Sequence, residues 1–239
     1  ADTNGDGIVD RYGVEVRPEG FAGYVQWIRA AGGDILDESW TRSRLNEPAT
    51  LEGLQYMRDL IWEHQVAPRI DDLGNYLFGN DRLGMYARGR WEVPGLLASG
   101  FTHFDIQHFP LWEADAPLYG HFGMGANGIL RDSENPDAAW EFLKYLSSAE
   151  SLMKFLQAVP TGLPPLRSLW PALAETPPNN WQAFFKALPN AVPVYSPPSY
   201  PDIQRIMDQA VLEALNDQAP VRALVERAHR QIEAVLSGE

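Results

Sequence analysis

Apolar residues at helical spacing are clearest in the segment NEPATLEGLQYMRDLIWEHQ, residues 46–65. Asn46 stands where a helix N-cap is expected, and Pro48 suits the first turn. Such a pattern is typical of a helix that packs one face on a core. The apolar face consists of Leu51, Leu54, Met57, Leu60 and Ile61.

The same spacing predicts further helices along the chain. The first of them is stopped by Gly32 and Gly33, because glycine readily adopts the backbone conformation that ends a helix. The predicted ranges are 21–33, 91–100, 135–148, 149–159, 179–188, 202–217 and 220–236. In the helix over 202–217 the inward positions are Ile203, Ile206, Met207, Ala210, Val211 and Leu215.

Alternating apolar and polar residues predict strands in other parts of the chain. The predicted strands are 11–16, 82–89, 104–110 and 123–131. Two Pro-rich stretches, 160–178 and 192–201, read as loops. Strands and helices are mixed without an internal repeat, so the pattern predicts an α/β fold.

Composition narrows the classes of function. The chain has 239 residues, enough for one large domain or two small ones, with 45% hydrophobic and 21% charged residues, as in ordinary soluble proteins. Its formal net charge of −13 argues against binding to nucleic acid or to an anionic membrane surface. The absence of cysteine excludes disulfides, thiolate metal sites and a cysteine nucleophile.

The N-terminal stretch DTNGDGIVDRYG has the spacing of a calcium loop. Gly7 stands at the sharp turn, but Gly13 takes the place of the usual bidentate Glu. Only Ala1 precedes the loop, and a strand-like segment follows it, so an EF-hand is not expected. The oxygen ligands offered by the loop would be Asp2, Asn4, Asp6, the backbone carbonyl of Ile8, and Asp10.

Two interpretations of this loop remain open. It is either a structural calcium site completed by a carboxylate from elsewhere, or an Asp/Asn/Gly turn without metal. Neither is a catalytic cofactor site, and no other cofactor is expected. A domain rarely starts on such a loop, so we expect further residues upstream.

The sequence offers no catalytic constellation. The motif at Gly123, Gly125 and Gly128 matches G-x-G-x-x-G, but no helix opens directly after it as a dinucleotide site requires. A bend or a close backbone approach explains these glycines better. The histidines do not pair at helical spacing, and there is no nucleophile elbow or P-loop. An enzyme is therefore not predicted.

Aromatic residues at junctions between elements are more informative. Trp91 follows a predicted strand directly, and Tyr200 lies in a Pro-rich loop. Rings at such junctions often contact ligands in α/β proteins, and the apolar faces of sugars stack well on them. We therefore expect Trp91 and Tyr200 to face a cleft. Trp27 is expected to pack in the core.

The order of segments resembles the extracellular solute-binding proteins of ABC transporters, in the sugar-binding group that includes maltose-binding protein. No single motif is diagnostic, but together the matching stretches cover nearly the whole chain in the order of the family. They are DTNGDGIVDRYG, WIRAAGGDILDES, NEPATLEGLQYMRDLI, RLGMYARGRWEVPGLL, FDIQHFPL, GMGANGILRDSENPDAAWEFLKYLSSAES and YPDIQRIMDQAVLEAL.

The resemblance implies a periplasmic-binding-protein fold of type II, with two α/β lobes and the ligand between them. It implies that this chain is a fragment that lacks most of the N-terminal lobe. The C-terminal lobe would comprise residues 1–123 and 176–239, and residues 124–175 would be an excursion into the N-terminal lobe.

The resemblance also implies a set of binding residues. Trp91 matches the cleft Trp that follows a G-x-W strand end, and Tyr200 lies near the last aromatic contact of the family. Phe21 and Tyr24 lie where the family places an aromatic at the start of a helix. Arg88 and Arg90, beside Trp91, could bond sugar hydroxyls or an acidic group. The EPYF-type sequence of maltose-binding protein is RPEGFAGY here, so the same sugar is not assumed.

The function implied is the binding component of an ABC importer for a mono- or oligosaccharide. Its partners would be the sugar and the permease subunits, with no nucleic acid. The location would be periplasmic or extracellular, and a lipid anchor on the full-length protein is left open. The alternatives are a carbohydrate-active hydrolase and a binding protein for an acidic or phosphorylated solute such as glycerol phosphate.

Overall fold

The chain divides into two compact units. The first unit comprises Ala1–Ala87, His108–Phe122 and Ala187–Glu239, and the second comprises Arg88–Gln107 and Gly123–Lys186. The lobe boundaries expected from the sequence stay a prediction. A computed structural model describes residues 1–7, 9–75, 77–116, 120–123, 125–158, 164–173, 178–193, 195 and 197–238.

The first unit contains two short parallel strand pairs. Strand β1 (Tyr12–Val14) pairs with β2 (Leu83–Met85), so that Tyr12 lies opposite Leu83. Strand β3 (Gly120–Phe122) pairs with β4 (Ala191–Pro193). Parallel pairing requires a long crossover connection. The connection between β1 and β2 contains several helices, as in α/β folds.

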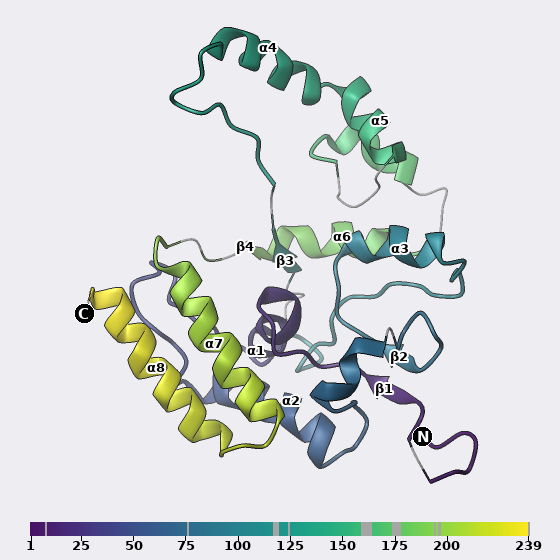
Figure 1. Cartoon of the computed structure of the whole chain (residues 1–239), viewed down its shortest axis with the longest axis vertical. Coiled ribbons are helices and arrows are strands. Elements are labelled where there is room, and N and C mark those ends of the chain that lie inside the picture. The colour runs from purple at the N-terminus through teal and green to yellow at the C-terminus, as the bar shows by residue number, and fades with distance from the viewer. Residues whose placement is uncertain are drawn as a thin grey trace. The chain divides into compact units, whose positions relative to one another are not determined.

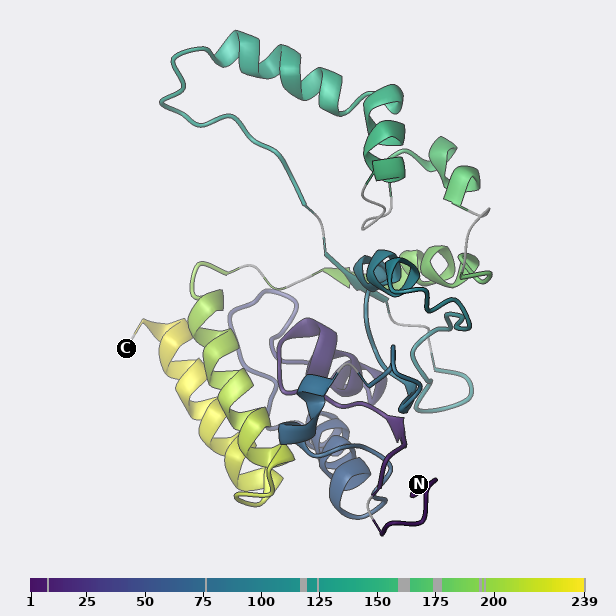
Figure 2. The ribbon, with the colours of Figure 1, turned by 45° about the vertical axis from the view of Figure 1, so that its right-hand side comes forward.

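Helices supply most of the first unit (Figure 1). Helices α7 and α8 lie side by side in Figures 1 and 2, and α2 packs against both. All six inward positions predicted for the helix over 202–217 are buried. The helices of this unit are η1 (Phe21–Val25), α1 (Gln26–Ala30), α2 (Pro48–Trp62), η2 (Ile70–Asn75), η5 (Leu188–Asn190), α7 (Tyr200–Leu215) and α8 (Val221–Ser237).

Two helix ends in this unit have clear local causes. Gly32 ends α1 with a φ of 86°, and the Gly33 amide donates to the Ile28 carbonyl. The N-cap of α2 is Glu47 rather than the predicted Asn46. Proline pushes the residue before it into an extended conformation, so Pro48 itself becomes the first helical residue.

The second unit has a smaller core, in which α3 and α6 lie side by side (Figures 1 and 2). The buried residues Val93, Leu156 and Trp181 pack with Phe104, Phe184 and their neighbours. Helix α4 buries none of its described residues, and its aromatic side chains are exposed. The helices are η3 (Arg90–Glu92), α3 (Val93–Ala98), α4 (Pro136–Leu146), α5 (Ala149–Ala158), η4 (Arg167–Leu173) and α6 (Gln182–Ala187), whose last residue falls in the first unit.

The predicted strand over 104–110 is wrong. The segment keeps alternating burial, but no residue in it belongs to a strand. Its polar groups bond to Asn180 instead of a partner strand. The Asn180 side chain donates to the Ile106 carbonyl at 2.9 Å, and the backbone N–H of Asn180 donates to the Asp105 carboxylate at 2.9 Å.

The predicted strand over 123–131 is also wrong. A strand, β3, occupies Gly120–Phe122 directly before it, and residues 125–131 are exposed and irregular. Among the described residues, nothing lies within 4 Å of a Cβ built on Gly123, Gly125 or Gly128. The expected close backbone approach is therefore absent there. The Pro-rich stretch 160–178 contains the short helix η4.

Candidate functional site

Tyr24, in η1, is tied to α7 by a buried hydrogen bond. Its side chain is only 1% exposed, and its hydroxyl donates to Asp208 Oδ1 at 2.9 Å. The same oxygen accepts the Gly20 amide at 3.0 Å, directly before η1. Burial and the Asp208 charge raise the pKa of Tyr24 well above 10. Tyr24 thus fixes the start of η1 and presents no open surface, and its role in binding stays a prediction.

Tyr200 opens α7 in the same unit and is half-buried. Burial raises its pKa, and the Asp208 charge raises it further. The backbone of Phe21 lies in η1, while its side chain falls outside the described part of the structure. The first unit therefore brings Tyr24 and Tyr200 around Asp208.

Sequence reasoning missed Asp208, Glu15 and Arg17. Glu15 follows β1 directly, is buried, and pairs with Arg17. The carboxyl end of a parallel strand is where α/β proteins place ligand contacts. The sequence places Glu15 inside the predicted strand 11–16, so the available signal was only an acidic residue with an arginine two residues later. The sequence offered no signal for Asp208, because its partner Tyr24 lies 184 positions away in sequence.

Arg29 of α1, a buried cation near Tyr200, was also missed. It is 4% exposed, its Nε lies 3.3 Å from Asp34 Oδ1, and its guanidinium lies 4.9 Å from the Tyr195 ring centre. Burial raises the pKa of Asp34, and the charge of Arg29 opposes that rise. Both terminal nitrogens of Arg29 are buried without a hydrogen-bond acceptor among the described residues.

Arg88, Arg90 and Trp91 lie together in the second unit, before α3. The Trp91 side chain is 46% exposed, as expected for a surface that receives a ligand. Arg90 is 5% exposed and lies 4.9 Å from the Trp181 ring centre, and burial lowers its pKa to about 10. Arg88 Nε lies 3.7 Å from Glu92 Oε1. The geometry therefore favours Trp91 as a contact surface more than either arginine.

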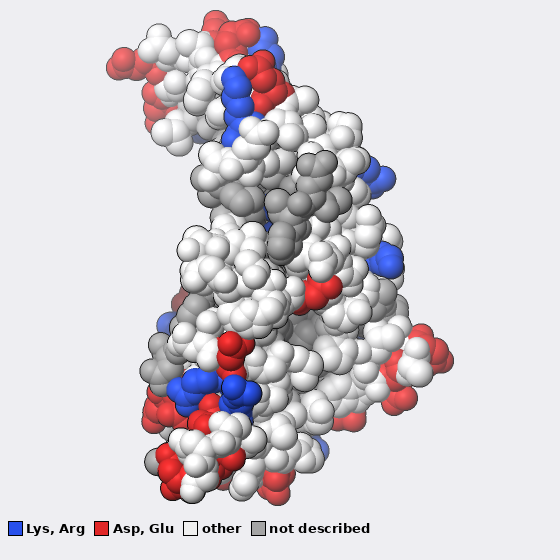
Figure 3. All heavy atoms as spheres, turned by 90° about the vertical axis from the view of Figure 1, so that its right-hand side faces the viewer, with Lys and Arg blue, Asp and Glu red and all other residues white. Residues whose placement is uncertain are grey.

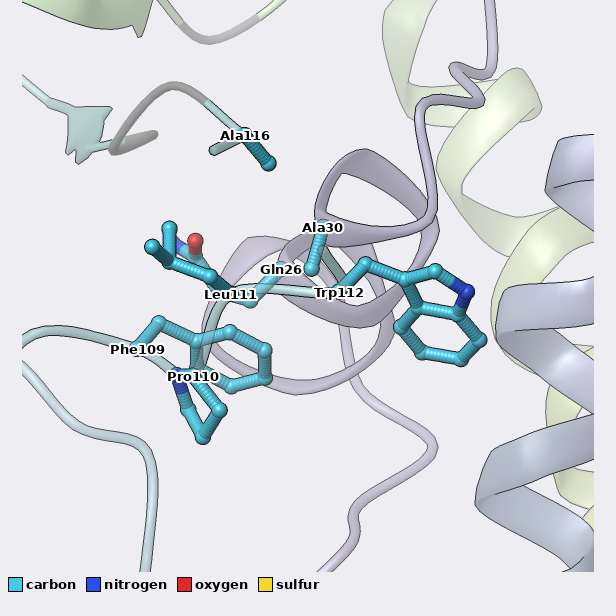
Figure 4. Close-up of a pocket in the computed structure, with 7 residues that line it drawn as sticks. All are labelled: Gln26, Ala30, Phe109, Pro110, Leu111, Trp112 and Ala116. Carbon is cyan, nitrogen blue, oxygen red and sulfur yellow. The ribbon is translucent and has the colours of Figure 1, made fainter. Parts of the chain in front are cut away.

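A shallow recess lies beside α1 in the first unit. In Figure 4 the Phe109 ring and the Trp112 indole lie on opposite sides of Gln26. The Phe109 and Trp27 rings meet edge to face with their centres 4.9 Å apart, and the Trp112 and Tyr56 rings do so with their centres 5.1 Å apart. Trp27 packs in the core, as predicted. The recess is far smaller than ligand clefts of roughly 300–1,000 Å³. Its lining residues are Gln26, Ala30, Phe109, Pro110, Leu111, Trp112 and Ala116.

The N-terminal loop is held by its own hydrogen bonds. The Asp2 carboxylate accepts the amides of Gly5 at 2.7 Å and Gly7 at 2.8 Å, and these bonds lower the Asp2 pKa. Asp10 accepts the amide of Thr3 at 3.0 Å. Among the described residues, no group of three or more His, Cys, Asp or Glu could hold a metal ion.

These contacts hold the turn in shape and leave both interpretations open. The Asn4 side chain donates to Asp6 Oδ2 at 3.1 Å, and its oxygen accepts the backbone amide of Asp6 at 3.0 Å. Ile8 lies outside the described residues. Calcium binding therefore stays a prediction of the loop spacing alone.

On the face shown in Figure 3, Lys and Arg side chains occur in small separate groups, some of them with acidic side chains beside them. Such a surface does not offer the continuous basic stripe that binds nucleic acid. Within the described residues, no helix combines the length and the apolar character needed to cross a lipid bilayer.

Several solved structures share the fold. An ABC transporter solute-binding protein from Thermotoga lettingae bound with α-D-tagatose aligns with a TM-score of 0.81 and 23% identity, over 95% of this chain and 60% of its own. The maltose/maltodextrin-binding domain from Bdellovibrio bacteriovorus bound to maltotriose aligns with a TM-score of 0.79 and 21% identity. This alignment covers 99% of this chain and 63% of the Bdellovibrio chain. The predicted type II periplasmic-binding-protein fold is confirmed.

Two curated relatives are named for the sugars that they bind. A maltotriose-binding protein from Pyrococcus abyssi is 25% identical over 132 residues, which is 54% of this chain and 29% of the relative. An arabinooligosaccharide-binding protein from Halalkalibacterium halodurans is 24% identical over 199 residues, 76% of this chain and 43% of the relative. The chain thus spans less than half the length of these relatives.

The family itself is identified by a model that covers most of the chain. Residues 10–184 match the family described as bacterial extracellular solute-binding protein. The matched range includes β1, α2, the Trp91 segment and α4, so it extends over both compact units. This chain belongs to the family of bacterial extracellular solute-binding proteins.

Proposed function

We propose that the full-length protein is the substrate-binding component of an ABC importer and captures an oligosaccharide. The observation that carries this proposal is the family match over residues 10–184. Both curated relatives are named as oligosaccharide-binding proteins, which favours that class of solute. Capture would take place between two lobes, followed by hinge closure and delivery to the permease.

Trp91 is proposed as the stacking surface for a sugar ring. Its large exposed indole supports this role, because an apolar sugar face and an aromatic face lose water together on contact. Tyr200 and Phe21 are proposed as further walls, whereas Tyr24, at 1% exposure, offers no surface to a sugar and would act only by holding η1 in place. The alternative of an acidic solute gains little support, because Arg90 is buried against Trp181 and Arg88 lies near Glu92.

The proposed role is binding without turnover, at a periplasmic or extracellular location. The family description supports an extracellular place, and members of the family are binding proteins. A lipid anchor on the full-length protein is a further proposal, drawn from the family resemblance.

A thermal-shift panel on the full-length protein tests the proposal. Malto- and arabino-oligosaccharides are screened together with monosaccharides and glycerol phosphate, and each hit is incubated with the protein and then analysed by chromatography. We expect at least one oligosaccharide to raise the melting temperature and to be recovered unchanged. Cleavage of any sugar would instead support the hydrolase, and a shift with glycerol phosphate alone would support the acidic solute.

A further inference from the structure

Gly89 lies directly under the Trp91 ring. A Cβ built on Gly89 would stand 1.9 Å from Trp91 Cζ3 and 2.3 Å from both Cε3 and Cη2. Real Cβ atoms essentially never approach other heavy atoms within 3.0 Å. The indole therefore occupies the space that any other residue at position 89 would need for its side chain.

The backbone of Gly89 does not itself require glycine. Its φ of −96° and ψ of 175° belong to the extended region that every residue adopts. Glycine is thus needed at this position because of the neighbouring ring, and not because of the left-handed backbone conformation that many glycines adopt in turns.

The residues around the ring leave little freedom for the backbone to yield. Gly89 is the N-cap of η3, and its carbonyl accepts the Glu92 amide at 3.2 Å. Arg90 and Val93, on either side of Trp91 in sequence, are both buried. An added methyl group at position 89 would therefore displace the indole, whose outer part is open to solvent, rather than the anchored backbone.

We propose that Gly89 is a positioning residue that makes room for the Trp91 indole and so sets the plane on which a sugar ring stacks. The inference deepens the proposed function and rests on it for the affinity, but the position of the ring can be measured without any ligand. Gly89 touches no sugar itself in this proposal and acts only through Trp91.

The first measurement follows the ring. The full-length protein is labelled with 5-fluorotryptophan, and the ¹⁹F signal of Trp91, one of the eight tryptophans of this chain, is assigned with Trp91→Phe. We expect Gly89→Ala to shift the Trp91 signal. Gly95→Ala is the matched control, because a Cβ at Gly95, six residues further along, meets none of the described residues within 4 Å. An unchanged Trp91 signal in Gly89→Ala overturns the proposal.

The second measurement is a double-mutant cycle on the affinity for the best oligosaccharide of the panel. We expect Gly89→Ala to weaken binding about tenfold, as expected when one aromatic stacking contact is lost. In the Trp91→Ala background the same substitution should have no further effect, because the ring through which it acts is gone. An equal loss in both backgrounds overturns the proposal.

The outcomes separate this proposal from the proposed function. A shifted ring signal in a protein that binds no oligosaccharide refutes the function and leaves the positioning of the ring intact. If Gly89→Ala alone fails to fold, the double variant Gly89→Ala/Trp91→Ala tests whether the clash with the indole is the cause. A double variant that folds supports the steric role of Gly89, and a double variant that does not fold overturns the proposal.

Discussion

Trp91 is the single residue on which the proposed binding surface depends most. Replacing it by alanine removes the indole face on which a sugar would stack. We expect Trp91→Ala to weaken oligosaccharide binding by about 1–3 kcal/mol, or roughly 5- to 150-fold, in calorimetric titrations of the full-length protein.

Trp140 provides the matched control for this substitution. It is an exposed tryptophan of α4 in the same unit, and no binding role is assigned to it. Trp140→Ala should leave the affinity unchanged. If Trp91→Ala and Trp140→Ala behaved alike, Trp91 would be removed from the site.

Tyr24 gives the clearest pH dependence of stability. Burial and Asp208 raise its pKa above the ordinary value of 10.0, so the folded protein keeps a proton that the unfolded chain loses above that pH. The stabilisation by Tyr24 is therefore fully present below pH 10 and is lost as the pH rises further. The stability difference between wild type and Tyr24→Phe should shrink by about 1.4 kcal/mol per pH unit above pH 10.

Urea unfolding of both proteins between pH 7 and pH 11 measures this difference. At pH 7, Tyr24→Phe should cost about 1–3 kcal/mol, because the hydroxyl bonds to a charged group. A difference that stays constant up to pH 11 would contradict the burial and the hydrogen bond of the phenol. The comparison cancels the other titrating tyrosines, which both proteins share.

The sequence could predict some of these residues and not others. The exposure of Trp91 was predicted from its place at the end of the predicted strand 82–89, although β2 ends at Met85 and Trp91 lies in η3. The burial of Arg90 did not, because a guanidinium is usually exposed and only the tertiary contact with Trp181 explains it. Asp208 could not be found either, since it acts on Tyr24 across 184 positions of sequence.

At the scale of elements, helices could be predicted better than strands. Strands β1 and β2 fall within the predicted ranges 11–16 and 82–89, while the predicted strands over 104–110 and 123–131 do not form. Each long helix carries its own period of apolar residues, as α2 and α7 do. A strand is stabilised by a partner that lies elsewhere in the sequence, so an alternating pattern alone does not decide whether a segment forms a strand. The segment 104–110 alternates in burial, yet its polar groups bond to Asn180 and form no ladder.

Close packing of α1 on α2 depends on Gly53. A Cβ at this position would lie 2.8 Å from the Trp27 carbonyl oxygen and 2.9 Å from Ile28 Cα, both backbone atoms that cannot move easily. We expect Gly53→Ala to destabilise the chain by about 1–3 kcal/mol in spite of the better helix propensity of alanine.

Gly95→Ala in α3 is the counterpart, because in the described part of the chain nothing lies within 4 Å of a Cβ at that position. It should raise the unfolding free energy by about 0.4–1 kcal/mol. Both variants are compared with wild type in the same urea titration. Stabilisation by Gly53→Ala would contradict the close approach of the two helices.

The N-terminal loop, residues 1–10, is an element whose metal content can be tested directly. Asp2 already accepts two amides of the loop, so we expect the turn to form without metal. Calorimetric titration with calcium up to millimolar concentration should give no heat and no thermal shift. A saturable heat that Asp2→Asn abolishes would show that calcium completes its shell there.

At the scale of the whole molecule, the α/β class followed from the mixed order of helices and strands. The type II architecture followed from the family resemblance and not from periodicity, because no local pattern specifies how two lobes are joined. The same limit applies to the lobe boundaries. These depend on contacts between segments distant in sequence, such as the pairing of β3 with β4.

The central claim is that this chain contributes to an oligosaccharide receptor, and calorimetry tests it most directly. The full-length protein and the 239-residue chain are titrated with the same oligosaccharide, chosen from the thermal-shift panel. We expect saturable binding by the full-length protein, with the sugar recovered unchanged. The chain alone should bind more weakly, since half of a cleft buries only part of a ligand. If the full-length protein bound none of the oligosaccharides, or cleaved the one that it bound, the claim would be contradicted.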